Sequence, residues 1–134
     1  MKAGFTGTQR GMTEAQRHGL ERLFEDLPIV EFHHGDCRGA DEEAHDIAKA
    51  FALSIVVHPP EDPKARAFCV GDEVRPPRPY LKRNADIVAA ADVLIAAPAS
   101  LHEVLRSGTW ATVREARRRG KRVYIIGPEG ELDV

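Results

Sequence analysis

Residues 107–128, SGTWATVREARRRGKRVYIIGP, indicate the fold most clearly, because a glycine-containing turn, an amphipathic helix and an apolar strand follow one another directly. The turn brings free backbone N–H groups and two hydroxyl groups to the start of the helix. The helix dipole favours an anion such as phosphate there. A Ser-Gly-Thr turn is also an ordinary helix cap, so its meaning depends on whether the rest of the chain supplies matching turns.

Length and composition favour one domain of a cytoplasmic protein. The chain has 134 residues, enough for a core of its own, and its two cysteines, Cys37 and Cys69, are too few for a disulfide framework. A secretory pattern and a long apolar run are both missing from the sequence, so we expect no membrane partner. The formal net charge of -2 offers no general attraction to nucleic acid. The basic run at residues 114–122 suits a solvated helix C-terminus.

Apolar runs and helical spacing alternate along the chain. Strands are predicted at 2–6, 29–32, 54–57, 93–97 and 123–126. Helices are predicted at 13–26, 40–51, 80–91 and after the turn at 107–109, the last one ending at Gly120. This alternation predicts an α/β fold, a Rossmann-like three-layer sandwich with a five-stranded, mainly parallel sheet. The Pro-rich segment 58–79 reads as a long loop within this single domain.

Three glycine-bearing turns, at residues 7–11, 34–39 and 107–109, come after predicted strands. In folds of this kind ligands bind beyond the carboxyl ends of the strands, where the strand order reverses. The three turns are therefore expected to face one crevice and to hold a phosphate there.

The turns and their neighbours resemble the SLOG superfamily, in particular its small YspA-like nucleotide-binding proteins. Related members are the LOG-type phosphoribohydrolases and the Rossmann domain of DNA-processing protein A (DprA-like). The resemblance rests on four segments, which are Gly7-Thr8-Gln9-Arg10, HGDCRGADEEAH at 34–45, Arg83-Asn84 and SGTWATVREA at 107–116. His58-Pro59 after the third strand also matches the YspA-like pattern. The resemblance covers nearly the whole chain and implies a nucleotide or nucleotide-derived ligand, with no resident cofactor and with a dimer or larger oligomer.

The expected ligand-binding residues come from these motifs. They are Gly7, Thr8, Arg10, Gly35, Asp36, Arg38, Gly39, Asp41, Arg83, Asn84, Ser107, Gly108 and Thr109. Arg83 is a candidate clamp, because a guanidinium binds two oxygens of phosphate or carboxylate at once, and Asn84 could bind a base or ribose edge. Asp41 could accept from ribose hydroxyls or cap a helix. Arg38 could instead brace its turn by pairing with Asp41 or Asp36.

An enzymatic role is less well supported by the motifs. LOG-type hydrolases are expected to carry a catalytic Glu at the position that Thr112 occupies here, and a hydroxyl cannot replace a carboxylate as general base. Catalytic candidates are Arg83, Asp41 and Glu115, with Glu103 as a further carboxylate. A LOG-like N-glycosidic or phosphoribosyl hydrolase remains the alternative to a nucleotide-binding protein. Single-stranded nucleic acid binding, as in DNA-processing proteins, is a second alternative.

Other chemistry-bearing residues have weaker patterns. His33, His34 and Cys37 have metal-ligand chemistry but no adjacent fourth ligand, so we expect no metal site. Trp110 suits the core but could stack on a base. The segment 58–79 carries four basic residues that could form a lid over phosphates, namely Lys64, Arg66, Arg75 and Arg78.

Overall fold

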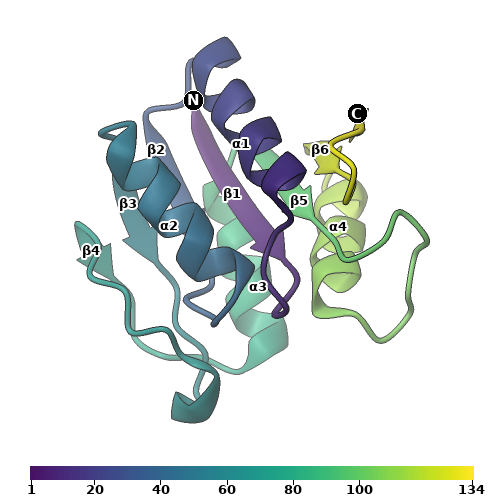
Figure 1. The fold of residues 1–134 in the computed structure, drawn as a ribbon. Coiled ribbons are helices and arrows are strands. Elements are labelled where there is room, and N and C mark those ends of the chain that lie inside the picture. Colours follow the sequence, from purple (N-terminus) through teal and green to yellow (C-terminus); the bar gives the residue numbers. More distant parts are fainter.

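The computed structural model describes residues 1–134, and it shows one sheet between two layers of helices (Figure 1). The strands are β1 (Lys2–Gly7), β2 (Glu31–His34), β3 (Ser54–Val57), β4 (Glu73–Val74), β5 (Val93–Ala97), β6 (Arg122–Ile126) and β7 (Leu132–Asp133). Their order is β4-β3-β2-β1-β5-β6-β7, and every neighbouring pair is parallel except β6 with β7. The α/β, Rossmann-like prediction is confirmed.

The sheet has seven strands, so the prediction of five is wrong in number. The additional strands, β4 and β7, are two residues long and exposed, and they extend the two edges of the sheet. A strand of two exposed residues has no alternating pattern, so neither strand could be predicted from periodicity. β2 covers Glu31–His34 rather than the predicted 29–32. Its last two residues are His33 and His34, whose buried polar side chains do not fit the apolar run on which the prediction rested.

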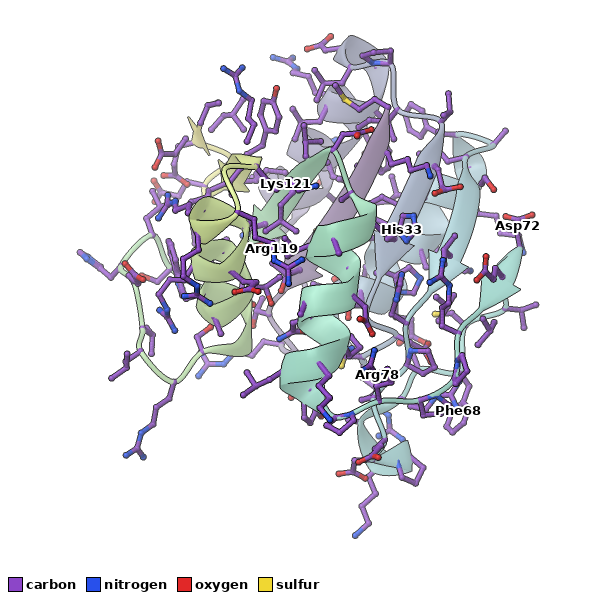
Figure 2. All side chains as sticks on the ribbon, turned by 180° about the vertical axis from the view of Figure 1, so that it is seen from behind. His33, Phe68, Asp72, Arg78, Arg119 and Lys121 are labelled. Atoms are coloured by element: carbon purple, nitrogen blue, oxygen red, sulfur yellow. The ribbon has the colours of Figure 1, made fainter.

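Four α-helices cover the two faces, two on each. Their bounds are α1 (Glu14–Asp26), α2 (Ala40–Ala50), α3 (Tyr80–Ala90) and α4 (Gly108–Arg118). α1 and α2 lie side by side on one face in Figure 1, and α3 and α4 cover the other, which faces the viewer in Figure 2. α1 begins with the predicted capping box, in which Thr13 accepts from the Gln16 backbone and the Gln16 side chain accepts from the Thr13 backbone. None of the helices has the length and apolar character needed to cross a bilayer.

Side chains that alternate along the strands build a core on each face of the sheet. Under α1 and α2, Phe24 packs edge-on against Phe32 with ring centroids 5.3 Å apart. Under α3 and α4, Trp110 packs with Leu94 and Ile125. Trp110 is only 5% exposed, so its side chain is a core residue at the start of α4.

The central strands β1 and β5 position the site. From β1 the chain proceeds through β2 and β3 toward one edge, whereas β5 lies on the other side of β1 and leads to β6. The strand order therefore reverses between β1 and β5, and a crevice forms beyond their carboxyl ends. The turn after β1 and the N-termini of α3 and α4 gather at this edge of the sheet (Figure 1).

The predicted loop 58–79 is tied to the sheet at several points. It contains a 3-10 turn (Pro63–Ala65) and β4, and Asp72 accepts a hydrogen bond of 2.8 Å from the Ile55 backbone. Three of its four basic residues form ion pairs, Arg66 with Asp36, Arg75 with Glu73 and Arg78 with Asp86. These contacts hold the segment against β2, β3 and α3.

Candidate functional site

A cavity of about 400 Å³ lies at the crevice between β1 and β5. Seventeen residues line it, among them eight of the predicted ligand-binding residues: Gly7, Thr8, Asp41, Arg83, Asn84, Ser107, Gly108 and Thr109. The walls come from the end of β1 and from the first turns of α2, α3 and α4. Two of the three glycine-bearing turns, at 7–11 and 107–109, therefore border one cavity, while the third contributes Cys37 and supports the wall from behind.

Three of the predicted glycines serve the packing of the protein itself. A Cβ on Gly7 would meet the Cβ of Ala40, and one on Gly35 would meet the guanidinium of Arg83. Gly39 precedes α2 with a φ of +93°, and a Cβ there would meet the backbone of Gln9. These glycines bring the turns and α2 close together, and only indirectly shape the cavity.

Gly108 is different, because nothing beyond its chain neighbours and the backbone of its own helix lies within 4 Å of a Cβ placed on it. It is the first residue of α4 and lines the cavity. Ser107 caps the helix by accepting a hydrogen bond of 3.3 Å from the Trp110 backbone N–H. The N–H groups of Gly108 and Thr109 belong to the first turn and have no intrahelical acceptor. The packing of the protein leaves the absence of a side chain at Gly108 unexplained, whereas a ligand approaching these N–H groups would require it.

Arg83 is the most unusual side chain of the cavity wall. The residue is only 6% exposed, yet its hydrogen-bond partners are neutral. Its Nη1 donates to the Gly35 and His58 carbonyl oxygens, the latter at 3.3 Å, and its Nε donates to Asn84 Oδ1 at 2.9 Å. Its Nη2 has only the Cys37 sulfur, 3.8 Å away. A buried charge is normally paired with an opposite charge, so this guanidinium is suited to an anionic ligand.

Asp41 is the one carboxylate in the wall of the cavity. It lies in the first turn of α2, and its Oδ2 accepts from the Cys37 backbone N–H at 3.1 Å. Burial raises the pKa of Asp41 to about 6, against the lowering effects of the Arg83 charge and of that hydrogen bond. Burial also raises the pKa of the Cys37 thiol, which is the main reason to regard Cys37 as an unreactive wall residue.

Five predicted residues lie away from the cavity wall or behind it, namely Gly39 at the start of α2 and the four that follow. Asp36 is fully buried and accepts from Arg66 Nε and from the Cys69 backbone, both at 2.9 Å, so it braces the segment 58–79. Arg38 is exposed, and its backbone, not its side chain, bonds to the Ala65 carbonyl; the expected pairing of Arg38 with Asp36 is taken by Arg66. Arg10 is exposed outside the wall, and Gly35 lies behind Arg83.

The other carboxylates considered for catalysis also lie outside this cavity. Glu115 accepts from Arg118 and Arg119, and the hydrogen bond from Arg118 lowers the pKa of Glu115. Glu103 accepts from Arg114 at 2.9 Å. Thr112, at the position of the missing Glu, is buried and donates to the Gly108 carbonyl at 2.9 Å. Only Asp41 and Arg83, of the predicted catalytic candidates, border the cavity.

The wall also contains residues that the motifs did not indicate. These are mainly Tyr80, Leu81, Leu105 and Arg106, two of them apolar side chains that are largely exposed. Arg106 directly precedes the Ser107 turn, and a cation next to a predicted phosphate turn is a signal that could have identified it. The two leucines carry no such signal, because exposed leucines in loops and at helix starts have many roles.

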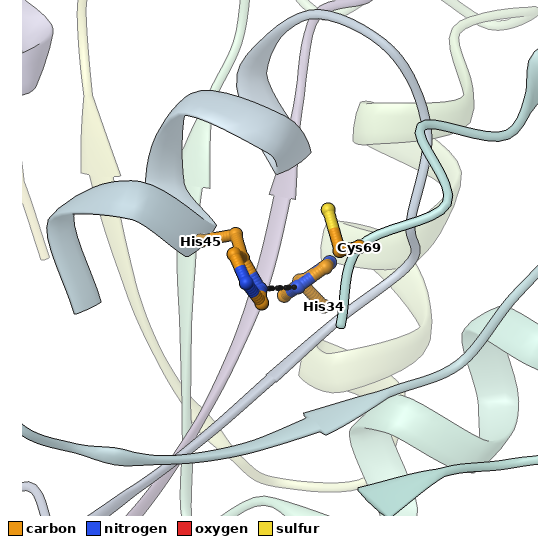
Figure 3. A group of neighbouring side chains, drawn as sticks. All are labelled: His34, His45 and Cys69. Carbon is orange, nitrogen blue, oxygen red and sulfur yellow. Dashed lines mark hydrogen bonds between the residues drawn. The ribbon is translucent and has the colours of Figure 1, made fainter. Parts of the chain in front are cut away.

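His34, His45 and Cys69 form the tightest group of metal-ligand side chains in the protein (Figure 3). His34 Nδ1 accepts from the Asp36 backbone at 3.0 Å, so His34 Nε2 carries the proton and donates to His45 Nδ1, 2.9 Å away. These hydrogen bonds occupy both ring nitrogens of His34 and the Nδ1 atom of His45, so a metal would have to displace them at His34. Burial lowers the pKa of His34 and raises that of Cys69 to about 12, which also favours neutral, hydrogen-bonded side chains.

Comparison with known proteins supports the fold. No protein-family model matches the sequence, and no curated protein matches it. Among solved structures, the molybdenum cofactor binding protein from Rippkaea orientalis is similar over 92% of this chain and 74% of its own, with 21% identity and a TM-score of 0.69. DNA processing protein A (DprA) from Helicobacter pylori is similar over 93% and 64%, with 19% identity and a TM-score of 0.67. DprA from Streptococcus pneumoniae is similar over 92% and 49%, with 16% identity and a TM-score of 0.67.

These neighbours share the Rossmann-like architecture with this chain. The chain spans less than two thirds of either DprA structure. Identities of 16–21% establish a common fold only, so the YspA-like assignment within the SLOG superfamily stays a prediction.

Proposed function

We propose that this protein binds a nucleotide or a nucleotide derivative in the cavity between β1 and β5. The phosphate would lie against the N–H groups of Gly108 and Thr109 and the guanidinium of Arg83. The ribose and base would extend toward Asp41 and Asn84. The observation that carries the proposal is the buried guanidinium of Arg83, which borders the cavity and makes direct hydrogen bonds to neutral groups only, while its charge acts on the Asp41 carboxyl without a direct ion pair.

The size and polarity of the cavity support a small phosphorylated ligand. A volume of about 400 Å³ falls at the low end of the range for ligand sites, which suits one nucleotide better than a dinucleotide. The hydroxyls of Thr8, Ser107 and Thr109 and the side chain of Arg106 add hydrogen-bond donors at the α4 end. Solved neighbours are named for binding single-stranded DNA or the molybdenum cofactor, which fits a ligand-binding role for this fold.

The experiment is a thermal-unfolding panel with nucleoside mono-, di- and triphosphates. A ligand at 100 times its dissociation constant adds about 2.7 kcal/mol of stability, which raises Tm by on the order of 10 °C. Arg83→Ala should remove the shift, and Arg83→Lys should reduce it, because Lys keeps the charge but cannot bind two oxygens in one plane. Arg119→Ala, on the exposed end of α4, is the matched control and should keep the full shift. A folded wild-type protein with no shift across the panel would refute the proposal.

Hydrolysis of an N-glycosidic bond is a second candidate, supported by Asp41. A carboxyl group whose pKa is raised to about 6 inside a cavity has the acidity expected of a general acid. Release of free base from nucleoside monophosphates, lost in Asp41→Asn, would favour this reading. Absence of base release at high protein concentration leaves binding alone.

Binding of single-stranded nucleic acid is a third candidate, supported by the likeness to DprA from Helicobacter pylori, which is described as binding single-stranded DNA. Phosphate contacts along a strand release counterions, so this mode requires an affinity that falls steeply with salt. Oligonucleotide binding that is undetectable or insensitive to salt would exclude it.

A further inference from the structure

A second cavity, of about 540 Å³, borders Arg83 from the region where β3 leads into the segment 58–79. His58, Arg75, Arg78 and Asp86 line it together with Arg83 and small residues of α3. His33, which supports this wall, and Arg78 both lie along the same flank of α3 in Figure 2. The proposed nucleotide site does not use His58, Arg75 or Arg78.

Positive charge predominates in this cavity. Three arginines line it against one carboxylate, Asp86. Arg78 binds Asp86 through Nη1 alone, at 3.0 and 2.8 Å, and Arg75 binds Glu73 through Nε. The other N–H groups of both arginines remain available, so the cavity can offer several charge-assisted hydrogen bonds to an anion.

A chain of hydrogen bonds fixes the tautomer of His58. Glu31 Oε2 accepts from His33 Nε2 at 2.7 Å, and a His33 ring that carries this one proton accepts at Nδ1 from His58 Nε2, 2.8 Å away. With its proton on Nε2, the neutral His58 ring has an unprotonated Nδ1. This atom has no hydrogen-bond partner in the protein and is not sealed from solvent, although the residue is only 3% exposed.

The surroundings keep His58 neutral. Burial is the main cause that lowers the pKa of His58 to about 3. Positive charge on Arg75 and Arg83, and on His33 whenever that ring is protonated, acts in the same direction. Arg78 and Asp86 are the other charged residues that face this cavity. Burial also lowers the pKa of His34, which follows His33 on β2. His58 Nδ1 therefore stays a hydrogen-bond acceptor across the neutral range.

We infer that this second cavity binds an oxyanion that still carries a proton, such as hydrogen phosphate or a singly protonated phosphate ester. The arginines would bind the charged oxygens, and the remaining P–OH would donate to His58 Nδ1. A fully ionised oxyanion such as sulfate has no proton to donate, so its oxygen would face the lone pair of the ring. That repulsion would give the cavity a preference for phosphate over sulfate.

The experiment titrates inorganic phosphate and sulfate into the protein by calorimetry at about pH 6 and about pH 8. Inorganic phosphate should bind at least about tenfold more tightly than sulfate at both pH values, because hydrogen phosphate still carries a P–OH group at the higher pH. Methyl phosphate in a parallel titration should be preferred over sulfate at the lower pH and lose that preference at the higher pH, where it has no P–OH group left. If methyl phosphate does not bind at the lower pH, the site takes free phosphate only.

Three variants assign the preference to the cavity. His58→Gln should remove it, because the Gln amide can still donate to His33 but has no acceptor at the position of Nδ1. Arg75→Gln, at an exposed side chain, should weaken both anions several-fold and keep the preference. Gly108→Ala, in the proposed nucleotide site, should leave the preference intact. Equal binding of the two anions, no phosphate binding, a preference that survives in His58→Gln, or one that disappears in Gly108→Ala would each overturn the inference.

Discussion

Single residues at the crevice have roles that their neighbours define. Gly7, Gly35 and Gly39 are glycines because other protein atoms occupy the space of a side chain. Gly108 faces open space, and the backbone N–H groups beside it have no intrahelical acceptor. A ligand that contacts these N–H groups is the physical reason we assign to a glycine at this position.

Gly108→Ala tests that assignment. The substitution should leave the free energy of unfolding unchanged or raise it by up to about 1 kcal/mol, because alanine is the better helix former. It should weaken nucleotide binding at least about tenfold, because its methyl group would stand in the path of the phosphate. Urea unfolding and calorimetric titration measure the two effects.

Gly120→Ala is the matched control for this prediction. A Cβ on Gly120 also meets nothing within 4 Å, but the residue follows the C-terminus of α4 with a φ of +71°. The strained backbone should cost about 1 kcal/mol of stability while nucleotide affinity stays unchanged. Unaltered affinity in Gly108→Ala would show that the phosphate does not lie at the start of α4.

Asp41 predicts a specific dependence of stability on pH. The pKa of Asp41 is about 6 in the folded protein, whereas an exposed aspartate has a pKa of 3.8. The folded state therefore holds the proton more tightly than the unfolded state does. The associated stability is fully present below about pH 4 and is lost as pH rises through about 6, on the order of 3 kcal/mol. Asp41→Asn should lack this loss. The measurement is the difference in unfolding free energy between wild type and variant at about pH 4, 5 and 7.

The buried histidines His34 and His58 have lowered pKa values, so they destabilise the wild type and the Asp41→Asn variant alike at acid pH. Their contribution cancels in the difference between wild type and variant. A difference that stays constant from pH 4 to pH 7 would mean that Asp41 titrates as an exposed carboxyl group.

At the scale of elements, one ion pair connects β2 to the segment 58–79. Asp36 follows β2 and is fully buried, and Arg66 Nε reaches it at 2.9 Å from beyond the 3-10 turn. The Arg66 guanidinium also lies 4.4 Å from the centroid of the Phe68 ring. This contact ties the segment to the end of β2, so opening the segment as a lid would require breaking a buried ion pair.

Arg66→Ala should therefore destabilise the protein by about 3 kcal/mol or more, because it leaves the Asp36 carboxylate buried and unpaired. Cleavage by a protease within residues 60–79 should become faster. Arg118→Gln is the control, since it removes an exposed ion pair with Glu115 and should change stability by less than about 1 kcal/mol. A change of that small size in Arg66→Ala would mean that the pair does not hold the segment.

Local signals along the sequence were sufficient for most elements. The Thr13 and Gln16 capping box, the apolar run of β5 and Gly120 after α4 each involve residues close in sequence. The pairing of Asp36 with Arg66 and the chain from Glu31 through His33 to His58 join residues on different segments. These contacts allow β2 to contain buried histidines and connect the segment 58–79 to the end of β2. No local sequence pattern predicts such contacts.

The site was predictable to a similar extent. Parallel strands placed the turn at Gly7 and the turn at Ser107 at one edge of the sheet, as their positions after strands suggested. The sequence could not show that Arg83 donates to the backbone carbonyl groups of Gly35 and His58. It also could not show that Asp36 forms an ion pair with Arg66 and lies outside the cavity. These contacts join residues that are far apart in the sequence, so only the three-dimensional structure shows which side chains meet.

The whole molecule presents its cavity at the point where the strand order reverses, and its overall charge of -2 gives no attraction to phosphate at long range. Recognition must therefore come from the local donors, namely the N-terminus of α4 together with Arg83 and Arg106. It follows that a ligand should be distinguished chiefly by its phosphate, with the base contributing less.

Calorimetric titration of a nucleoside monophosphate, beside the same nucleoside without phosphate, tests this central claim most directly. Two or more charge-assisted hydrogen bonds to the phosphate should make the monophosphate bind at least about 100-fold more tightly, with one molecule bound per chain. Equal affinities for the two compounds, or no heat from either with the folded protein, would contradict phosphate recognition at the crevice between β1 and β5.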